Sequence, residues 1–315
     1  MTSEPTQRHA ALLIHGLGGT EYDLGSMHKI LRRAGLDTHG ITLPGHGLEP
    51  NSLLDVSAEQ WLDAARDKYR DLLGQYESVH LIGMCMGALL AIEVAKQERH
   101  QRGRLVALAP PIFIDGWSTP WYARLRFLLY RLPLVPRRMR VVEEEPFGIK
   151  NDMIRAIVKA KFARGENFHY RWVPLHCVQQ VDRLRHWVMS GLRQILCPTL
   201  VVHAREDELT SVKSAEFLQR EIGDERVAVT IVENSYHMIC IDNDREQVAA
   251  NVLAHLGLDP EIARRSRRSA GAGDALAERI ARRATRQQAN AAAPADTAAT
   301  DAPTDAPTDE TAALD

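Results

Sequence analysis

The sequence has little cysteine, no long apolar run and almost no net charge. Its 315 residues include four cysteines with no Cys-x-x-Cys pair, so a disulfide framework is not indicated and free thiols are expected. No uninterrupted apolar stretch reaches the roughly 18 residues of a membrane-spanning helix, and residues 1–9 lack a signal-peptide core. A formal net charge of -2 gives no general attraction to nucleic acid. We therefore expect a cytoplasmic protein with no nucleic-acid partner.

The remaining composition, 45% hydrophobic and 25% charged, is that of a globular chain with a large core. Apolar segments typical of strands alternate with helix-forming segments, which indicates a parallel sheet covered by helices on both faces. We expect an α/β fold with a mostly parallel sheet of about six strands. The predicted strands are 10–15, 36–43, 79–84, 104–109, 198–203 and 227–232, and the predicted helices between them include 22–34, 58–73, 214–221 and 246–256.

This alternation breaks at Pro110-Pro111 and resumes at Pro198. The intervening residues 110–196 are irregular and rich in Trp, Arg and Pro, so we expect a helical cap inserted into a core formed by residues 10–109 and 197–258. At the ends, residues 1–9 are expected to be flexible. Residues 259–315 pass from an Arg/Ala-rich segment to an acidic Pro/Thr run that cannot bury enough apolar surface to order itself.

One segment, residues 79–90, joins an apolar strand to helix formers through the turn Gly83-Met84-Cys85-Met86-Gly87. Such a turn is typical of a nucleophile elbow, in which glycines flank a reactive side chain because a Cβ there would clash with neighbouring backbone. A helix beginning after Cys85 would direct free N–H groups at its sulfur and favour the thiolate. A small buried thiol between chance glycines gives the same pattern, so the interpretation depends on partners elsewhere in the chain.

Acyl-transfer chemistry at an elbow needs a nucleophile, an acid and a base, in that chain order. Asp207 and His237 each follow a predicted strand, at the edge of the sheet where the elbow also lies. Glu206 and Glu208 are rivals for the role of the acid, and His237 is one of thirteen histidines. Their order and placement together predict that Cys85, Asp207 and His237 form a catalytic triad.

The oxyanion hole of such a site consists of backbone N–H groups. We predict one donor at Met86, directly after the nucleophile, and one at Leu17 in the glycine-rich loop after the first strand. His46, in the loop 43–47, is expected to be structural because no triad role is left unfilled.

Together these segments resemble the α/β-hydrolase superfamily, and most of all its bacterial carboxylesterases and monoacylglycerol lipases with a small helical cap. The resemblance spans residues 10–256 and implies ester hydrolysis through an acyl-enzyme, no metal or cofactor, and substrate entry beneath the cap. The segments that carry it are His15-Gly16-Leu17-Gly18-Gly19, Leu43-Pro44-Gly45-His46-Gly47, Gly83-Met84-Cys85-Met86-Gly87, Val201-Val202-His203-Ala204-Arg205-Glu206-Asp207 and Ser235-Tyr236-His237.

Cys85 departs from that resemblance, since those esterases carry serine at the elbow. Cysteine in this turn is similar to dienelactone hydrolases and to polyhydroxyalkanoate synthases, which handle acyl thioesters, although the rest of the chain lacks their length and surroundings. A thiolate attacks readily but also leaves more readily than an alkoxide, so activated esters, lactones and thioesters suit it better than amides. An acyltransferase with the same triad and a non-catalytic binding protein on a hydrolase scaffold remain alternatives.

The predicted cap holds aromatic, aliphatic and arginine side chains, with no Asp or Glu between Asp115 and Glu143. This composition predicts a pocket for a small apolar acyl ester or thioester. It also allows weak contact of the cap with a lipid surface.

Overall fold

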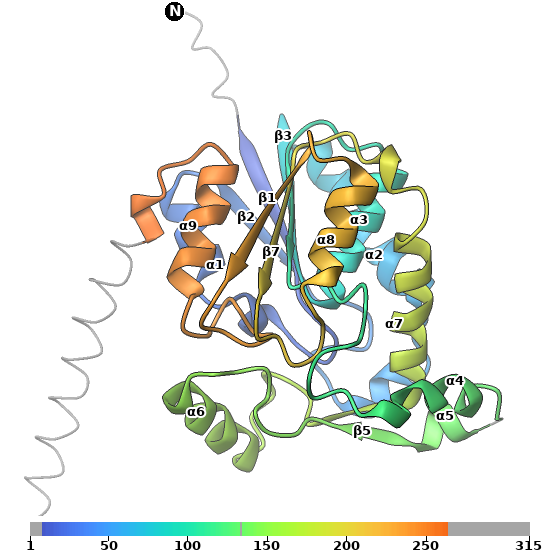
Figure 1. Ribbon diagram of the computed structural model, residues 1–315. Coiled ribbons are helices and arrows are strands. Elements are labelled where there is room, and N and C mark those ends of the chain that lie inside the picture. The colour runs from blue at the N-terminus through green and yellow to red at the C-terminus, as the bar shows by residue number, and fades with distance from the viewer. Residues whose placement is uncertain (1–7, 133, 264–315) are drawn as a thin grey trace, which may run out of the picture. The chain divides into compact units, whose positions relative to one another are not determined.

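The computed structural model describes residues 8–132 and 134–263, and Figure 1 shows their arrangement. Six parallel strands form the main sheet in the order β2-β1-β3-β4-β7-β8. The predicted fold class is therefore confirmed. The strands are β1 (His9–Ile14), β2 (Asp37–Ile41), β3 (Ser78–Met84), β4 (Leu105–Leu108), β7 (Thr199–Ala204) and β8 (Val227–Val232).

Successive strand residues point to opposite faces of this sheet and build two separate cores. Leu12 and Leu81 belong to the core shared with α2 (Ala58–Leu73), α3 (Met86–Gln97) and α8 (Lys213–Ile222). Their neighbours Leu13 and Ile82 belong to the core shared with α1 (Met27–Arg33) and α9 (Arg245–His255). Figure 1 shows α1 and α9 on one side of the sheet and α2, α3 and α8 on the other. Burial on both faces explains why the strands are continuous apolar runs.

The predicted helix 22–34 is wrong as one element. It consists of the 3-10 helix η1 (Glu21–Leu24) and of α1, separated by Gly25. Gly25 has φ 55°, and a Cβ there would lie 2.4 Å from the Cys240 carbonyl oxygen. The close approach of that loop requires a glycine and interrupts the helix. A second 3-10 helix, η2 (Pro50–Leu53), follows β2.

The insert, residues 110–196, is not purely helical. A two-stranded antiparallel sheet, β5 (Arg140–Val142) and β6 (Trp172–Pro174), joins its parts. The last long helix, α7 (Leu175–Val188), packs on α2 and α3 and shares their core. The other elements are η3 (Trp121–Leu125), α4 (Arg126–Leu129), α5 (Val135–Arg138), α6 (Asp152–Ala163) and η4 (Leu192–Gln194).

The predictions for the two ends of the chain lie largely outside the described residues. His9, assigned to the flexible N-terminal segment, is the first residue of β1. Ala263, assigned to the tail, is buried in the core beside α9, and Ile262 packs against the same core. His9 at one end, and Ile262 and Ala263 at the other, therefore belong to the core although they lie outside its predicted boundaries. In the described parts of the chain, no helix has the length and apolar character needed to cross a bilayer.

Candidate active site

Cys85 occupies a strained turn between β3 and α3, with φ 55° and ψ -122°. A Cβ on Gly83 would lie 2.1 Å from the Gly87 carbonyl oxygen, and a Cβ on Gly87 would lie 2.1 Å from the Ile14 carbonyl oxygen. Both glycines are therefore required for the helix to begin so close to the sheet. The turn leaves Cys85 half-buried, whereas the other three cysteines are buried. Its geometry is that of a nucleophile elbow.

Asp207 and His237 lie in the loops after β7 and β8 and contact each other in the interior. His237 Nδ1 donates a hydrogen bond of 2.8 Å to Asp207 Oδ2, and both side chains are buried. Asp207 Oδ1 accepts from the backbone N–H groups of Leu209 and Thr210 at 2.9 and 3.0 Å. These backbone bonds fix the carboxylate and, through it, the orientation of the imidazole.

The surroundings of His237 favour its charged form. Burial disfavours the imidazolium, but the charges of Asp207 and Cys85 and their hydrogen-bonding contributions outweigh burial and raise the His237 pKa well above its usual value. Burial likewise opposes the charged form of Asp207, yet His237 holds the Asp207 pKa below its usual value. Within the described residues, His237 Nε2 makes no well-formed hydrogen bond, although the Cys85 side chain is close enough to add to the raised pKa.

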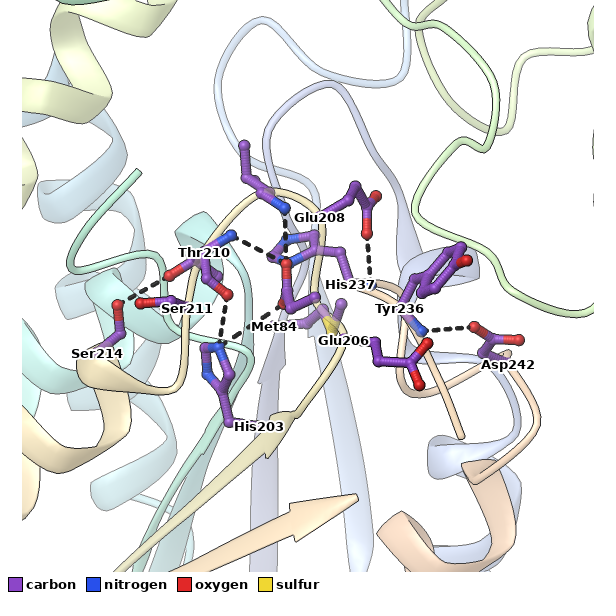
Figure 2. Close-up of polar contacts among 12 residues, drawn as sticks. Met84, His203, Glu206, Glu208, Thr210, Ser211, Ser214, Tyr236, His237 and Asp242 are labelled. Carbon is purple, nitrogen blue, oxygen red and sulfur yellow. Dashed lines mark hydrogen bonds and ion pairs between the residues drawn. The ribbon is translucent and has the colours of Figure 1, made fainter. Parts of the chain in front are cut away.

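The two rival acids have other positions. Glu206 has a half-exposed side chain whose carboxylate lies 2.8 Å from Lys150 Nζ. Glu208 is buried, and its Oε2 accepts the backbone N–H of His237 at 3.0 Å, as Figure 2 shows. Burial raises the Glu208 pKa. Of the three acidic residues in this loop, Asp207 is the one in contact with the His237 ring.

Another buried histidine, His203, lies beside Thr210 in Figure 2. Its Nε2 donates to the Thr210 carbonyl oxygen at 2.9 Å and lies 3.8 Å from Asp207 Oδ2. Burial lowers the His203 pKa, so this imidazole is neutral. His203 therefore supports the loop that carries the acid.

The glycine-rich loop after β1 approaches the elbow at Gly16. A Cβ on Gly16 would lie 3.2 Å from the Cys85 Cβ, so the two loops touch. Met86 is the first residue of α3, and its N–H precedes the first intrahelical hydrogen bond. Leu17 N–H donates to no protein acceptor in the described parts of the chain. Within the described residues, neither predicted oxyanion donor has a protein acceptor.

His46 and His15 lie next to this loop. His46 is buried, stacks on Tyr170 and contacts Trp61, and burial lowers its pKa to about 3. His15 accepts the Leu43 N–H at Nε2 and donates from Nδ1 to the Gly16 carbonyl oxygen. Burial lowers the His15 pKa, which matches this neutral tautomer. Both histidines tie the ends of β1 and β2 together.

The insert is anchored on the loops that carry Asp207 and His237. Gly116 N–H donates to the Leu209 carbonyl oxygen at 3.0 Å, and Ser118 N–H donates to the Glu208 carbonyl oxygen at 3.0 Å. Met238 N–H donates to the Gly148 carbonyl oxygen at 2.8 Å. These contacts, like the role of Glu208, had no signal in the sequence because they join residues far apart in the chain. In the described parts of the chain, no group of three His, Cys, Asp or Glu residues is arranged to hold a metal ion.

Comparison with known proteins finds relatives over most of this chain. The chain is 23% identical over 248 residues to a carboxylesterase of Bacillus subtilis (strain 168), covering 78% of this chain and 92% of the relative. It is 20% identical over 245 residues to a thermostable monoacylglycerol lipase of Bacillus sp. (strain H-257), covering 77% and 88%. The solved monoacylglycerol lipase of Paleococcus ferrophilus superposes with a TM-score of 0.65 at 19% identity, covering 79% of this chain and 96% of that one. A metagenome-derived lipolytic enzyme superposes with a TM-score of 0.67 at 21% identity, covering 79% and 94%. Residues 11–251 match the model of the alpha/beta hydrolase family, and the chain belongs to that family.

Proposed function

We propose that this protein hydrolyses carboxylic esters or thioesters through an acyl-enzyme on Cys85, with His237 as the base and Asp207 as the residue that orients it. The observation that carries the proposal is the buried Asp207–His237 hydrogen bond of 2.8 Å beside the cysteine of a strained elbow. Relatives named carboxylesterase and monoacylglycerol lipase support the choice of ester chemistry.

In the proposed reaction, the Cys85 thiol passes its proton to His237 Nε2, the sulfur attacks the substrate carbonyl carbon, and the electrons of the carbonyl π bond move to its oxygen. The N–H groups of Leu17 and Met86 stabilise that oxyanion. Collapse of the intermediate expels the alcohol or thiol, which takes a proton from His237. His237 then activates a water molecule, whose attack on the acyl-thioester releases the acid and restores the thiol. These steps use protein groups and water alone, without a metal or cofactor.

The proposed substrate is a small ester or thioester with an apolar acyl chain and a good leaving group. The tetrahedral intermediate expels the better leaving group, and a thiolate leaves more readily than an alkoxide. Activated esters and thioesters therefore complete acylation. The intermediate formed from an amide expels the Cys85 thiolate instead and reverts to the substrate. We place the protein in the cytoplasm as part of this proposal, because reducing conditions keep Cys85 a free thiol.

The insert is proposed to act as a cap, and its outer surface to make weak contact with lipid. Trp121 is 88% exposed and Leu128 is 61% exposed. Between these two positions in the sequence stands the basic residue Arg124. Exposed aromatic and basic residues favour the boundary between headgroups and acyl chains. Sedimentation with anionic and neutral vesicles tests this contact. Equal recovery of wild type and Trp121→Ser in the supernatant would contradict it.

The experiment that tests the proposed function compares wild type with Cys85→Ser and Cys85→Ala on short p-nitrophenyl esters and acyl thioesters. We expect an acyl adduct on Cys85 in the intact mass of wild type, retained ester hydrolysis in Cys85→Ser, and none in Cys85→Ala. Acid release that is slow in water, together with fast acylation of an added alcohol or thiol, would replace the hydrolase by an acyltransferase. Tight ligand binding with neither adduct nor turnover would indicate a binding protein.

A further inference from the structure

Three consecutive residues of the insert, Phe168, His169 and Tyr170, lie along the glycine-rich loop that follows β1. The Phe168 carbonyl oxygen accepts a hydrogen bond from Thr20 Oγ1 at 2.8 Å. Tyr170 N–H donates to the Gly18 carbonyl oxygen, also at 2.8 Å. The insert therefore holds this loop at two points, with His169 between them.

The Asp23 carboxylate lies inside the same loop. Asp23 belongs to η1 and is 2% exposed, and its Oδ2 accepts the Gly16 N–H at 3.2 Å. A Cβ on Gly19 would lie 1.8 Å from that oxygen, so the loop closes around the carboxylate only with glycine there. The Gly16 N–H is occupied by Asp23, which leaves the adjacent Leu17 N–H for a ligand.

The same carboxylate lies close to the proposed nucleophile. The position of a Cβ on Gly16 is 3.2 Å from the Cys85 Cβ and 3.3 Å from Asp23 Oδ2. Asp23 and Cys85 thus flank one glycine from two sides. A negative charge at this point opposes the oxyanion that forms when sulfur attacks the carbonyl.

His169 supplies the opposite charge. Its Nδ1 lies 3.3 Å from Asp23 Oδ1, and its Nε2 lies 3.9 Å from Glu143, whose side chain is 43% exposed. Burial disfavours the charged imidazole, but Asp23 and Glu143 outweigh burial and raise the His169 pKa to about 10. The neighbouring His15 is neutral, and Lys161 of α6 lies over the Phe168 ring. His169, whose side chain is 17% exposed, is therefore the cation that faces Asp23.

We propose that Asp23 and His169 are a positioning pair for the oxyanion hole. The carboxylate fixes the loop so that Leu17 N–H faces the substrate oxygen, and the imidazolium from the insert cancels the carboxylate's charge next to that oxygen. Neither residue touches the substrate; both act through the loop. The inference rests on the proposed function, because it takes Cys85 as the nucleophile and Leu17 as a donor.

Removing the two charges of the pair, singly and together, distinguishes this role from simple loop support. His169→Gln keeps a donor but leaves Asp23 uncompensated, so kcat should fall roughly tenfold while KM stays within about twofold. Asp23→Asn leaves a cation, which does not oppose the oxyanion, and should lose less. The double variant carries neither charge and should recover most of the lost kcat. His186→Gln, an exposed histidine of α7, is the matched control. A double variant as impaired as His169→Gln overturns the proposal.

Two modifiers of Cys85 provide a second readout. Hexanal adds to the thiol: the S–H proton passes to His237, a sulfur–carbon bond forms as the carbonyl π bond breaks, and the resulting oxyanion binds the proposed N–H donors. Iodoacetamide alkylates sulfur with loss of iodide and forms no oxyanion. In His169→Gln, the inhibition constant of hexanal should rise roughly tenfold with an unchanged alkylation rate.

The outcomes separate this inference from the proposed function. Unchanged hexanal inhibition in His169→Gln, or equal slowing of both modifications, overturns the positioning pair alone. Wild-type enzyme that stays active after both modifiers overturns the assignment of Cys85, and with it the proposed function. Melting curves of all variants show whether each one still folds. If His169→Gln does not fold, the kcat and the hexanal inhibition constant of Asp23→Asn are compared with those of wild type instead.

Discussion

Asp207→Asn is the most informative single change at the proposed site, because the structure dictates how the new amide must lie. Asp207 Oδ1 accepts two backbone N–H groups, from Leu209 and Thr210. An asparagine keeps both bonds only if its oxygen occupies that position, which turns its NH2 group toward His237 Nδ1. The imidazole then has to carry its proton on Nε2, the nitrogen that must be free to take a proton.

The expected loss of kcat in Asp207→Asn can be estimated from the second orientation of the asparagine amide, in which its oxygen faces His237. Restoring the productive tautomer requires the amide to rotate, which loses two backbone hydrogen bonds of about 1 kcal/mol each. It also replaces a charge-assisted bond to His237 by a neutral one, at about 1 kcal/mol more. A total near 3 kcal/mol corresponds to a fall in kcat of roughly 100-fold with little change in KM. His237→Ala removes the base altogether and should lose more.

Steady-state kinetics on a p-nitrophenyl ester over a range of pH measure this prediction. Because Asp207 raises the His237 pKa, the profile of the residual activity should also move to lower pH. Glu206→Gln is the control, since that carboxylate is half-exposed and pairs with Lys150. An Asp207→Asn variant within threefold of wild type, or a Glu206→Gln variant equally impaired, would refute the reasoning.

Three further predictions concern the elbow and the stability of the core. Iodoacetamide at neutral pH should label Cys85 first and stop turnover, because burial raises the pKa of Cys177, Cys197 and Cys240 to between about 11 and about 12. Peptide mapping that finds another cysteine labelled first would contradict this. Gly87→Ala should lower the free energy of unfolding by about 3 kcal/mol, because its Cβ meets backbone at 2.1 Å, while Gly74→Ala, with nothing closer than 3.4 Å, should be neutral by urea titration. Unfolding should also become easier as pH falls from about 6.5 toward 4, because histidines buried as neutral rings bind protons only in the unfolded chain; a urea midpoint independent of pH in this window would contradict that. These histidines, with pKa values lowered to about 3, 4 and 4, are His46, His80 and His100.

The sheet could be predicted from sequence because its strands are buried on both faces. Leu12, Leu13 and Ile14 are all fully or almost fully buried, so β1 appears as an uninterrupted apolar run. The elbow could be predicted because Gly83 and Gly87 are required by close backbone contacts within one short segment. The catalytic roles assigned from these patterns stay predictions, which the variants above test.

Other features left no local signal. The strands β5 and β6 are three residues each, too short for an alternating pattern, and residues 143–171 separate them in the chain. Asp23 and His169 are 146 residues apart, and neither lies in a recognisable motif. Gly25 interrupts a helical pattern only because the carbonyl of Cys240 approaches it in the fold. The β5–β6 pairing, the Asp23–His169 contact and the interruption at Gly25 all depend on contacts between segments far apart in the chain. A single sequence carries no local pattern for such contacts.

The anchoring of the insert has a consequence for how substrate choice and catalysis are connected. The insert bonds to the loop of Asp207 through Gly116, to the loop of His237 through Gly148, and to the glycine-rich loop through Tyr170. All three are backbone-to-backbone hydrogen bonds, so side chains of the insert can change without removing them. Some side chains of the insert also contact core loops: Ser118 Oγ donates to the Glu208 carbonyl oxygen at 2.7 Å, and His169 carries the charge that faces Asp23. Substitutions of insert side chains that make none of these contacts should therefore alter which acyl chain is accepted, whereas a substitution at His169 should alter the rate for every substrate.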